Sequence, residues 1–370
     1  MMKFAADRGM GATILPLDRQ AAGPAYFPTA AALGGVPLAM STDLATLERP
    51  PARVSPSSPH VWLGPDLRDA DFVVRLPDEC LAELDAVVAE QRKAPVPTLI
   101  LLPEHFAMSA CRQWMAGIKQ RLDEGLGFVI LDRLPVDRWS KRELTDIYWL
   151  IGSLLEPPVA QDWPGTMIYD VRHDGQPYTG ETRTALTPEG LDMHNDSSMG
   201  EAPPNYISLL CLNTAKSGGK SSLSSAYAAH VHIQDRHPDL LARMYQPFYR
   251  HHQEYQAPDA GKSNWYPIFG IEPDGGLRIR FNARVIRRGY AKTGRVLDEA
   301  GVRSVELMDG FLGNPEYRHD FFMEPGQMQI LNNRFIVHGR TPYVDHDEPE
   351  KRRHLLRLWL RKGDRRQFRG

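Results

Sequence analysis

The sequence predicts a mainly β protein with flanking helices. Beyond Pro157 the chain breaks into short apolar runs bounded by Gly, Pro, Asn or Asp, a pattern typical of strands. Amphipathic helical patterns gather instead in the N-terminal third. The 370 residues are enough to bury a substantial core, in one large domain or two. These three observations predict two packed sheets or a barrel, with helices supplied mostly by the N-terminal third.

The composition is that of an ordinary soluble protein, with 42% hydrophobic and 24% charged residues. The formal net charge is only -2 and no long run carries one sign, so nothing favours nucleic acid or an anionic membrane surface as a partner. We expect a small-molecule partner, and the sequence leaves the oligomeric state open.

The cysteines and the N-terminus bear on the compartment. Cys80, Cys111 and Cys211 are odd in number and share no C-x-x-C spacing, which argues against a disulfide framework and a cysteine-rich zinc site. The first residues lack the pattern of a secretory signal, and no stretch is apolar enough to span a bilayer. We therefore expect a cytoplasmic protein.

Residues 1–60 are rich in Ala, Gly and Pro, which predicts an N-terminal arm with sparse regular structure. A disordered leader and a segment that helps to cover the site remain alternatives for this arm. Residues 61–370 are expected to form a single domain with a helical N-terminal part.

Helices and strands follow in order along that domain. Asp78 and Glu79 open an amphipathic helix, residues 109–124 form a second, and Ser140 caps a third that runs to residue 155, with Glu143 in a capping-box relation. Helical segments are also expected near 225–245 and 298–312. The predicted strands are residues 128–131, 167–171, 206–212, 277–281, 327–331 and 355–360.

A polar stretch near the middle carries the candidate metal site. Residues two apart on a strand point to the same side, so His194 and Asp196 can present an imidazole and a carboxylate to one point. His338 closes an apolar run over 330–337 that is expected to be a strand delivering it to the same place. Two imidazoles and one carboxylate, with the other coordination positions of the metal open, suit non-haem Fe(II). An H-x-D triplet alone is weak evidence, because the chain has 13 histidines and 46 acidic residues.

Two arginines near the C-terminus add an anion site. On a strand, Arg353 and Arg357 face the same way, and a guanidinium directed into a β interior is costly unless it meets an anion. The pair therefore predicts bound carboxylates.

The order of these pieces resembles the TauD/TfdA family of Fe(II)- and 2-oxoglutarate-dependent dioxygenases, including its clavaminate-synthase-like branch. The likeness covers roughly residues 60–362 and implies a double-stranded β-helix, or jelly-roll, core. The matching pieces are His194-x-Asp196, Ser217-Gly218-Gly219-Lys220-Ser221, Asn332-Asn333-Arg334-x-x-x-His338-Gly339-Arg340 and Arg353-x-x-x-Arg357-x-Trp359.

The resemblance implies a role for each matched residue. His194, Asp196 and His338 match the iron ligands and so the catalytic centre. Ser221 and Arg353 match the residues that hold the distal carboxylate of 2-oxoglutarate. Asn195 stands where many relatives have Thr, and its side chain is expected to point away from the metal. The candidate substrate-binding residues are Arg357, matched to a position facing an acidic group of the primary substrate, with Arg280, Arg183 and Gln161 as further candidates, for each of which an ordinary structural role is the alternative.

We therefore predict an Fe(II)- and 2-oxoglutarate-dependent oxygenase that uses O2 to hydroxylate a small, carboxylate-bearing metabolite such as an amino acid or its derivative, releasing succinate and CO2. Desaturation or cyclisation with the same cofactors is one alternative. A non-catalytic metal-binding β-barrel module and a zinc hydrolase are two others.

Overall fold

The computed structural model describes residues 52–173, 175, 184–251, 263–363, 366 and 368. The chain divides into two units, Met1–Ser41 and Thr42–Gly370, and all of the described residues belong to the second. The predicted arm over 1–60 thus falls mostly outside the described residues and stays a prediction.

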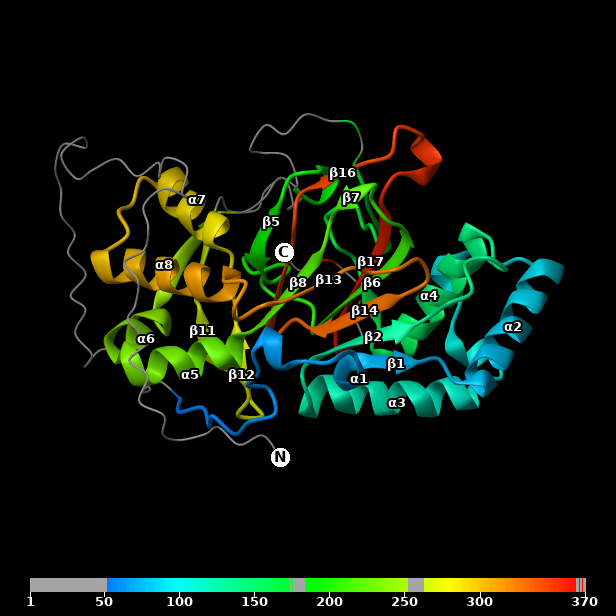
Figure 1. The fold of residues 1–370 in the computed structure, drawn as a ribbon, viewed down its shortest axis with the longest axis horizontal. Coiled ribbons are helices and arrows are strands. Elements are labelled where there is room, and N and C mark those ends of the chain that lie inside the picture. The colour runs from blue at the N-terminus through cyan, green and yellow to red at the C-terminus, as the bar shows by residue number, and fades with distance from the viewer. Residues whose placement is uncertain are drawn as a thin grey trace. The chain divides into compact units, whose positions relative to one another are not determined.

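Two facing sheets form the core of this unit (Figure 1). The larger has seven strands in the order β1-β2-β14-β6-β17-β3, with β4 also paired to β17, and the smaller has four in the order β13-β8-β15-β5. Across the described ranges the strands make an open jelly roll and no closed barrel, so the predicted fold is confirmed and the barrel alternative is not needed. The larger sheet contains β1 (Val73–Arg75), β2 (Phe128–Asp132), β3 (Pro158–Val159), β4 (Tyr169–Val171), β6 (Tyr206–Asn213), β14 (Met328–Asn332) and β17 (His354–Leu360); the smaller contains β5 (Leu191–His194), β8 (Ser221–Ser225), β13 (His319–Phe321) and β15 (Ile336–Arg340).

The larger sheet is buried on both faces. Val129 and Leu131 of β2 pack among the N-terminal helices, whereas Phe128 and Ile130 belong to the core between the two sheets. This is the period-two alternation of a strand with two covered faces. Within the described part of the chain, three small antiparallel pairs lie outside the two sheets: β7 (Ser217–Gly218) with β16 (Tyr343–Val344), β9 (Pro247–His251) with β10 (Ser263–Pro267), and β11 (Phe269–Ile271) with β12 (Leu277–Ile279).

The predicted N-terminal helices are present and cover the larger sheet. Helix α4 begins after the capping box predicted from Ser140 and Glu143, in which each side chain accepts a hydrogen bond from the other residue's backbone N–H. Tyr148 anchors α4 to the sheet, because its hydroxyl donates toward the carbonyls of Ser208 and Leu356. The predicted helices are α2 (Asp78–Lys93), α3 (Ser109–Glu124) and α4 (Lys141–Leu155), and they are preceded by α1 (Asp69–Phe72), which was not predicted. Short 3-10 turns lie in the N-terminal part, η2 (Gly64–Asp66), η3 (Thr98–Ile100) and η4 (Pro103–His105), and later in the chain, η5 (Thr184–Leu186) and η6 (Pro349–Lys351).

A second group of helices gathers on the other side of the sheets in Figure 1. These are α5 (Ala226–Arg236), α6 (Pro238–Met244), α7 (Ala283–Thr293) and α8 (Glu299–Gly313). The helical segment expected near 225–245 is present as two helices divided at His237, because Pro238 restricts the residue before it to non-helical backbone. Helix α7 was not predicted, since the run around Phe281 reads as a strand with flanking arginines until Asn282 caps a helix.

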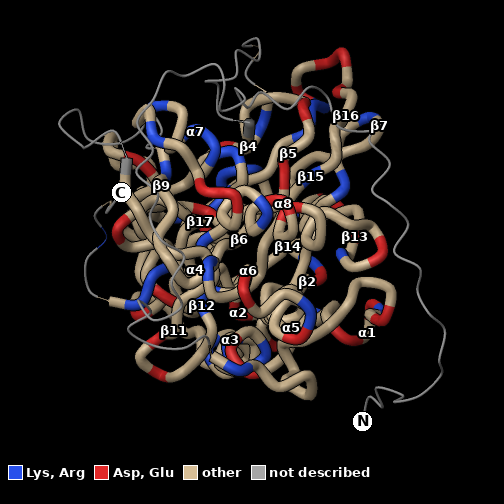
Figure 2. The backbone as a smooth tube through the Cα atoms, turned by 90° about the vertical axis from the view of Figure 1, so that its left-hand side faces the viewer, with Lys and Arg blue, Asp and Glu red and all other residues tan. Residues whose placement is uncertain are grey.

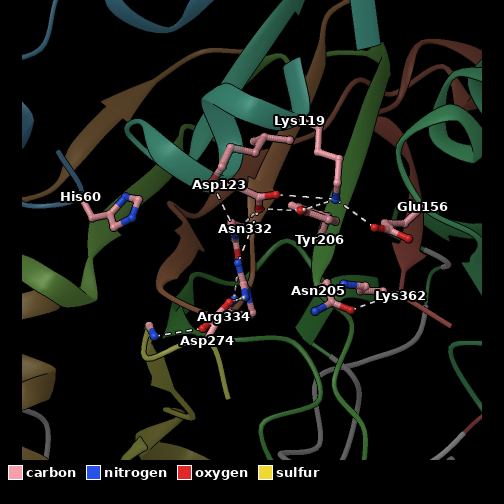
Figure 3. A network of polar contacts seen from close by, with 12 residues as sticks. His60, Lys119, Asp123, Glu156, Asn205, Tyr206, Asp274, Asn332, Arg334 and Lys362 are labelled. Atoms are coloured by element: carbon pink, nitrogen blue, oxygen red, sulfur yellow. Dashed lines mark hydrogen bonds and ion pairs between the residues drawn. The ribbon is translucent and has the colours of Figure 1, made fainter. Parts of the chain in front are cut away.

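The run 330–337 was expected to be one strand. It is instead divided by a turn that connects the two sheets. β14 ends at Asn332 in the larger sheet and β15 begins at Ile336 in the smaller one. Asn332 Nδ2 donates to Asp123 Oδ1 over 3.1 Å, and Arg334 Nη1 reaches Asp274 at 3.3 Å (Figure 3). These polar side chains hold the turn that a continuous apolar strand would not make.

Basic and acidic residues are interspersed along the described backbone (Figure 2), in keeping with the near-neutral net charge. None of the described helices is both long and apolar enough to cross a membrane.

Candidate metal centre

Three ligand-type side chains meet between the two sheets. His194 and His338 lie opposite each other on β5 and β15, and Asp196 follows β5 in a turn. Asp196 Oδ1 is 3.4 Å from His194 Nε2 and 3.9 Å from His338 Nε2. All three side chains are buried, and their ligand atoms lie within 4.8 Å of one another. The residues predicted to form the metal site are therefore brought together.

Asp196 reaches this point from a turn and not from the extended strand that was expected. β5 ends at His194, and Ser197 adopts a left-handed backbone with φ of 53°. Asn195 points away from the site, as expected, and its amide donates to the carbonyls of Asn333 and Ile336 over 2.8 and 2.9 Å. These bonds fix the turn before Asp196 to the turn before His338.

Asn333 makes the reciprocal contacts. Its Oδ1 accepts from the Asp196 backbone N–H over 3.0 Å, and its Nδ2 donates to the Asp196 carbonyl over 3.1 Å. The side-chain amides of Asn195 and Asn333 thus connect the two loops that carry the ligands, through hydrogen bonds with backbone groups. Asn195 and Asn333 were not recognised as positioning residues from the sequence, because an Asn in a loop is also an ordinary turn residue.

The hydrogen bonds around the cluster leave its ligand atoms available. His194 Nδ1 lies 2.8 Å from the carbonyl of Asp192, a partner that accepts the ring proton and leaves the Nε2 lone pair free. On Asp196, Oδ2 accepts from Trp359 Nε1 over 2.7 Å and forms an ion pair of 3.0 Å with Arg357 Nη1. Oδ1 is the oxygen that faces the two histidines.

The charges fit a metal site. Burial alone raises the pKa of Asp196, but Arg357 and the two histidines outweigh it and hold that pKa far below its usual range. Burial, with His194 nearby, lowers the pKa of His338 to about 3. The carboxylate is therefore charged and the His338 imidazole neutral, the protonation states that metal ligation requires.

A buried arginine, Arg353, immediately precedes β17. The Arg353 side chain packs on the Tyr343 ring at 5.3 Å, and its Nη1 has no hydrogen-bond partner among the described residues. A Cβ atom at Gly219 would stand 3.3 Å from Arg353 Nε, and Gly219 has φ of 72°. Ser221, two residues later, is buried at the start of β8. A buried guanidinium with an unsatisfied donor fits a carboxylate ligand.

The candidate substrate residues lie in different surroundings. Arg357 Nε donates to Gln161 Oε1 over 2.8 Å, so these two candidates contact each other. Arg280 is buried, donates to the Gly200 carbonyl over 2.5 Å and packs on the Tyr266 ring. Arg183 lies outside the described residues. Their roles toward a substrate stay predictions. The contact of Trp359 with Asp196 was missed, although its spacing from Arg357 puts both on one strand face.

Comparison with known proteins agrees with this geometry. Residues 107–359 match the family model described as taurine catabolism dioxygenase TauD, TfdA family. FR-33289 synthase of Streptomyces rubellomurinus (strain ATCC 31215) is 28% identical over 254 residues, covering 67% of this chain and 73% of the relative. The taurine hydroxylase-like protein SAT17 of Stachybotrys chartarum (strain CBS 109288 / IBT 7711) is 26% identical over 315 residues, covering 80% and 77%.

Solved structures share the fold at low sequence identity. Asparagine oxygenase, in complex with Fe(II), 3-hydroxyasparagine and succinate, superposes with a TM-score of 0.58 at 16% identity, covering 80% of this chain and 94% of that one. The non-haem iron oxygenase OrfP with Fe and α-ketoglutaric acid gives a TM-score of 0.57 at 12% identity, covering 79% and 94%.

Proposed function

Because this chain belongs to the TauD/TfdA family of dioxygenases, we propose that it hydroxylates a small carboxylate-bearing metabolite, an amino acid or a derivative of one, with release of succinate and CO2. Its cofactors are Fe(II) and the co-substrate 2-oxoglutarate, and it consumes O2. The finer proposal concerns the substrate and the outcome of the reaction.

Each residue of the site has one task in this proposal. His194, Asp196 and His338 would hold the iron through two neutral imidazoles and one carboxylate oxygen. Arg353 would pair with the distal carboxylate of 2-oxoglutarate, and the Ser221 hydroxyl would donate a hydrogen bond to it. When bound, iron and 2-oxoglutarate together activate dioxygen and supply the oxidant.

One observation carries the catalytic assignment: the protein has both a buried His-Asp-His cluster and a buried arginine, Arg353, whose Nη1 has no hydrogen-bond partner among the residues described. A protein that only binds metal, or a zinc hydrolase, has no need of a separate anion site. A co-substrate that chelates iron at one end and carries a carboxylate at the other needs both a metal site and an anion site.

Two observations support an amino-acid-type substrate. Two of the structurally similar oxygenases were solved in complex with a hydroxylated amino acid, asparagine oxygenase with 3-hydroxyasparagine and OrfP with 3-hydroxyarginine. Arg357 uses Nε and Nη1 within the protein, whereas its Nη2 donates no hydrogen bond to any of the described residues. We assign the Nη2 donors to an acidic group of the substrate, the role that the family resemblance implied for this arginine.

The test is a panel of amino acids and their acidic derivatives, incubated with the protein, Fe(II), 2-oxoglutarate and labelled dioxygen. We expect one member to stimulate succinate release and to gain one labelled oxygen atom by mass spectrometry. A product that instead loses two hydrogens favours desaturation or cyclisation. Absence of succinate with every substrate, together with metal-dependent hydrolysis of an ester or amide, would exclude the oxygenase.

A further inference from the structure

The carboxylate of Asp196 is bound unequally at its two oxygens. Oδ2 lies 2.7 Å from Trp359 Nε1 and 3.0 Å from Arg357 Nη1. Oδ1 lies nearest the imidazoles, 3.4 Å from His194 Nε2. One oxygen is thus occupied by protein donors and the other is presented to the metal site.

Both donors come from one rigid strand. Arg357 and Trp359 are two residues apart on β17 and so project to the same face of the sheet. Trp359 is paired in the sheet with Ile207 of β6 and Val159 of β3, and its side chain is buried. The position of the indole N–H is therefore fixed by the sheet and not by the metal site itself.

The guanidinium of Arg357 is fixed by a separate contact. Gln161 Oε1 accepts from Arg357 Nε over 2.8 Å, and Gln161 Nε2 donates to the Arg357 carbonyl over 2.8 Å. Gln161 also donates to the Met167 carbonyl and is buried. The amide thus binds the side chain and the backbone of the same arginine, which aims Nη1 at Asp196.

We infer that Arg357 and Trp359 act as a clamp on Asp196 Oδ2, with Gln161 holding Arg357, and that the clamp makes Asp196 a one-oxygen ligand through Oδ1. The inference rests on the proposed iron site. A carboxylate free to rotate can offer both oxygens to a metal and fill a second position. The clamp would prevent this and so leave room at the iron for 2-oxoglutarate and dioxygen. Arg357 and Trp359 are in this respect positioning residues.

The inference differs from a purely substrate-binding role for Arg357. If Arg357 served only the substrate, its replacement would leave metal binding unchanged. If it orients Asp196, its replacement changes metal affinity and geometry without any substrate present. Partners that orient metal ligands typically contribute 10- to 100-fold to affinity.

The experiment uses Co(II) as the probe, in the full-length protein without substrate or oxygen. Visible d–d absorption reports coordination geometry, and titration gives the dissociation constant. We expect Trp359→Phe and Arg357→Gln each to weaken Co(II) binding by about 10- to 100-fold and to change the band intensity. Arg357→Lys, which keeps the charge, should recover part of the loss, and Gln161→Leu should weaken binding less than Arg357→Gln.

Two controls separate the clamp from a general loss of stability. Tyr148→Phe removes buried hydrogen bonds to Ser208 and to Leu356 of the same strand β17, and should leave Co(II) binding unchanged. In an Asp196→Ala background, Trp359→Phe should cause no further loss, because the clamp acts only through that carboxylate.

Wild-type affinity and spectrum in folded Trp359→Phe and Arg357→Gln would overturn the inference, as would an equal additional loss in the Asp196→Ala background. If either variant does not fold, Gln161→Leu decides, and wild-type affinity and spectrum in that variant would overturn the inference. The Co(II) measurements do not depend on the substrate panel. If the variants weaken Co(II) binding as expected but no substrate stimulates succinate release, the result counts against the proposed function and not against the clamp.

Discussion

His194 and His338 face each other across neighbouring antiparallel strands, with ring centroids 4.4 Å apart. Because side chains alternate along a strand, a slip of one residue in this register would turn one imidazole away from the site. The metal site therefore depends on the sheet register, which the paired amides of Asn195 and Asn333 hold at the end of both strands.

Arg353→Ala should weaken 2-oxoglutarate binding by at least tenfold. Truncating one partner of a buried, charge-assisted pair costs about 2 to 5 kcal/mol of binding free energy. A tenfold change in the dissociation constant corresponds to about 1.4 kcal/mol, so the expected loss exceeds tenfold. Ser221→Ala should have a smaller effect, since a neutral hydrogen bond contributes about 1 kcal/mol net. Anaerobic titration of the Fe(II) protein with 2-oxoglutarate measures both. An unchanged constant in folded Arg353→Ala would move the anion site to another arginine.

Gly219→Ala should also weaken 2-oxoglutarate binding and lower stability. The new Cβ would lie 3.3 Å from Arg353 Nε, on a backbone with φ of 72° that L side chains rarely adopt. Gly117→Ala is the matched control, because nothing lies within 4 Å of a Cβ there. Gly117 lies inside α3, so its replacement should stabilise the protein by about 0.5 to 1 kcal/mol. Thermal melting and the same titration are applied to both variants. Equal melting temperatures and equal 2-oxoglutarate dissociation constants would contradict the close approach of Gly219 to Arg353.

Stability should fall between about pH 6.5 and pH 4 in part because of His230. Burial lowers the pKa of this histidine to about 4, so the unfolded chain takes up a proton in this range and the folded chain does not. The stability contributed by neutral His230 is present above about pH 6.5 and is lost as the pH falls toward 4, up to about 3 kcal/mol.

His230→Gln should therefore make the acid side of the stability curve less steep, measured by urea unfolding at several pH values. His105→Gln is the control, because this histidine is exposed and its replacement removes no buried imidazole. If the slope is the same in His230→Gln and wild type, His230 takes up its proton in the same pH range in the folded and the unfolded protein, which would contradict the lowered pKa.

Much of the fold followed from local patterns. The boundaries of α3 and the capping box of α4 were predicted from caps and periodicity, signals that lie within a few residues of each other. The turn between β14 and β15 was missed because the residues that hold it, such as Asp123 and Asp274, are far away in the sequence. Long-range polar contacts leave no periodic signal.

The candidate site divides in the same way. The residues that meet in the cluster could be named from a short motif and a distant histidine. The contacts of Arg357 with Asp196 and Gln161 could not, because an inward-facing arginine is equally suited to a substrate carboxylate and to an internal one. Only the structure shows which partners lie within reach.

In the proposed site, His194, Asp196 and His338 hold an iron to which 2-oxoglutarate binds. Visible absorption of the anaerobic protein with Fe(II) and 2-oxoglutarate tests this site without any substrate. We expect a weak metal-to-ligand charge-transfer band in the wild type that is abolished by His338→Ala, while the folded state is retained. An unchanged band and undiminished Fe(II) binding in both His194→Ala and His338→Ala would contradict the assignment.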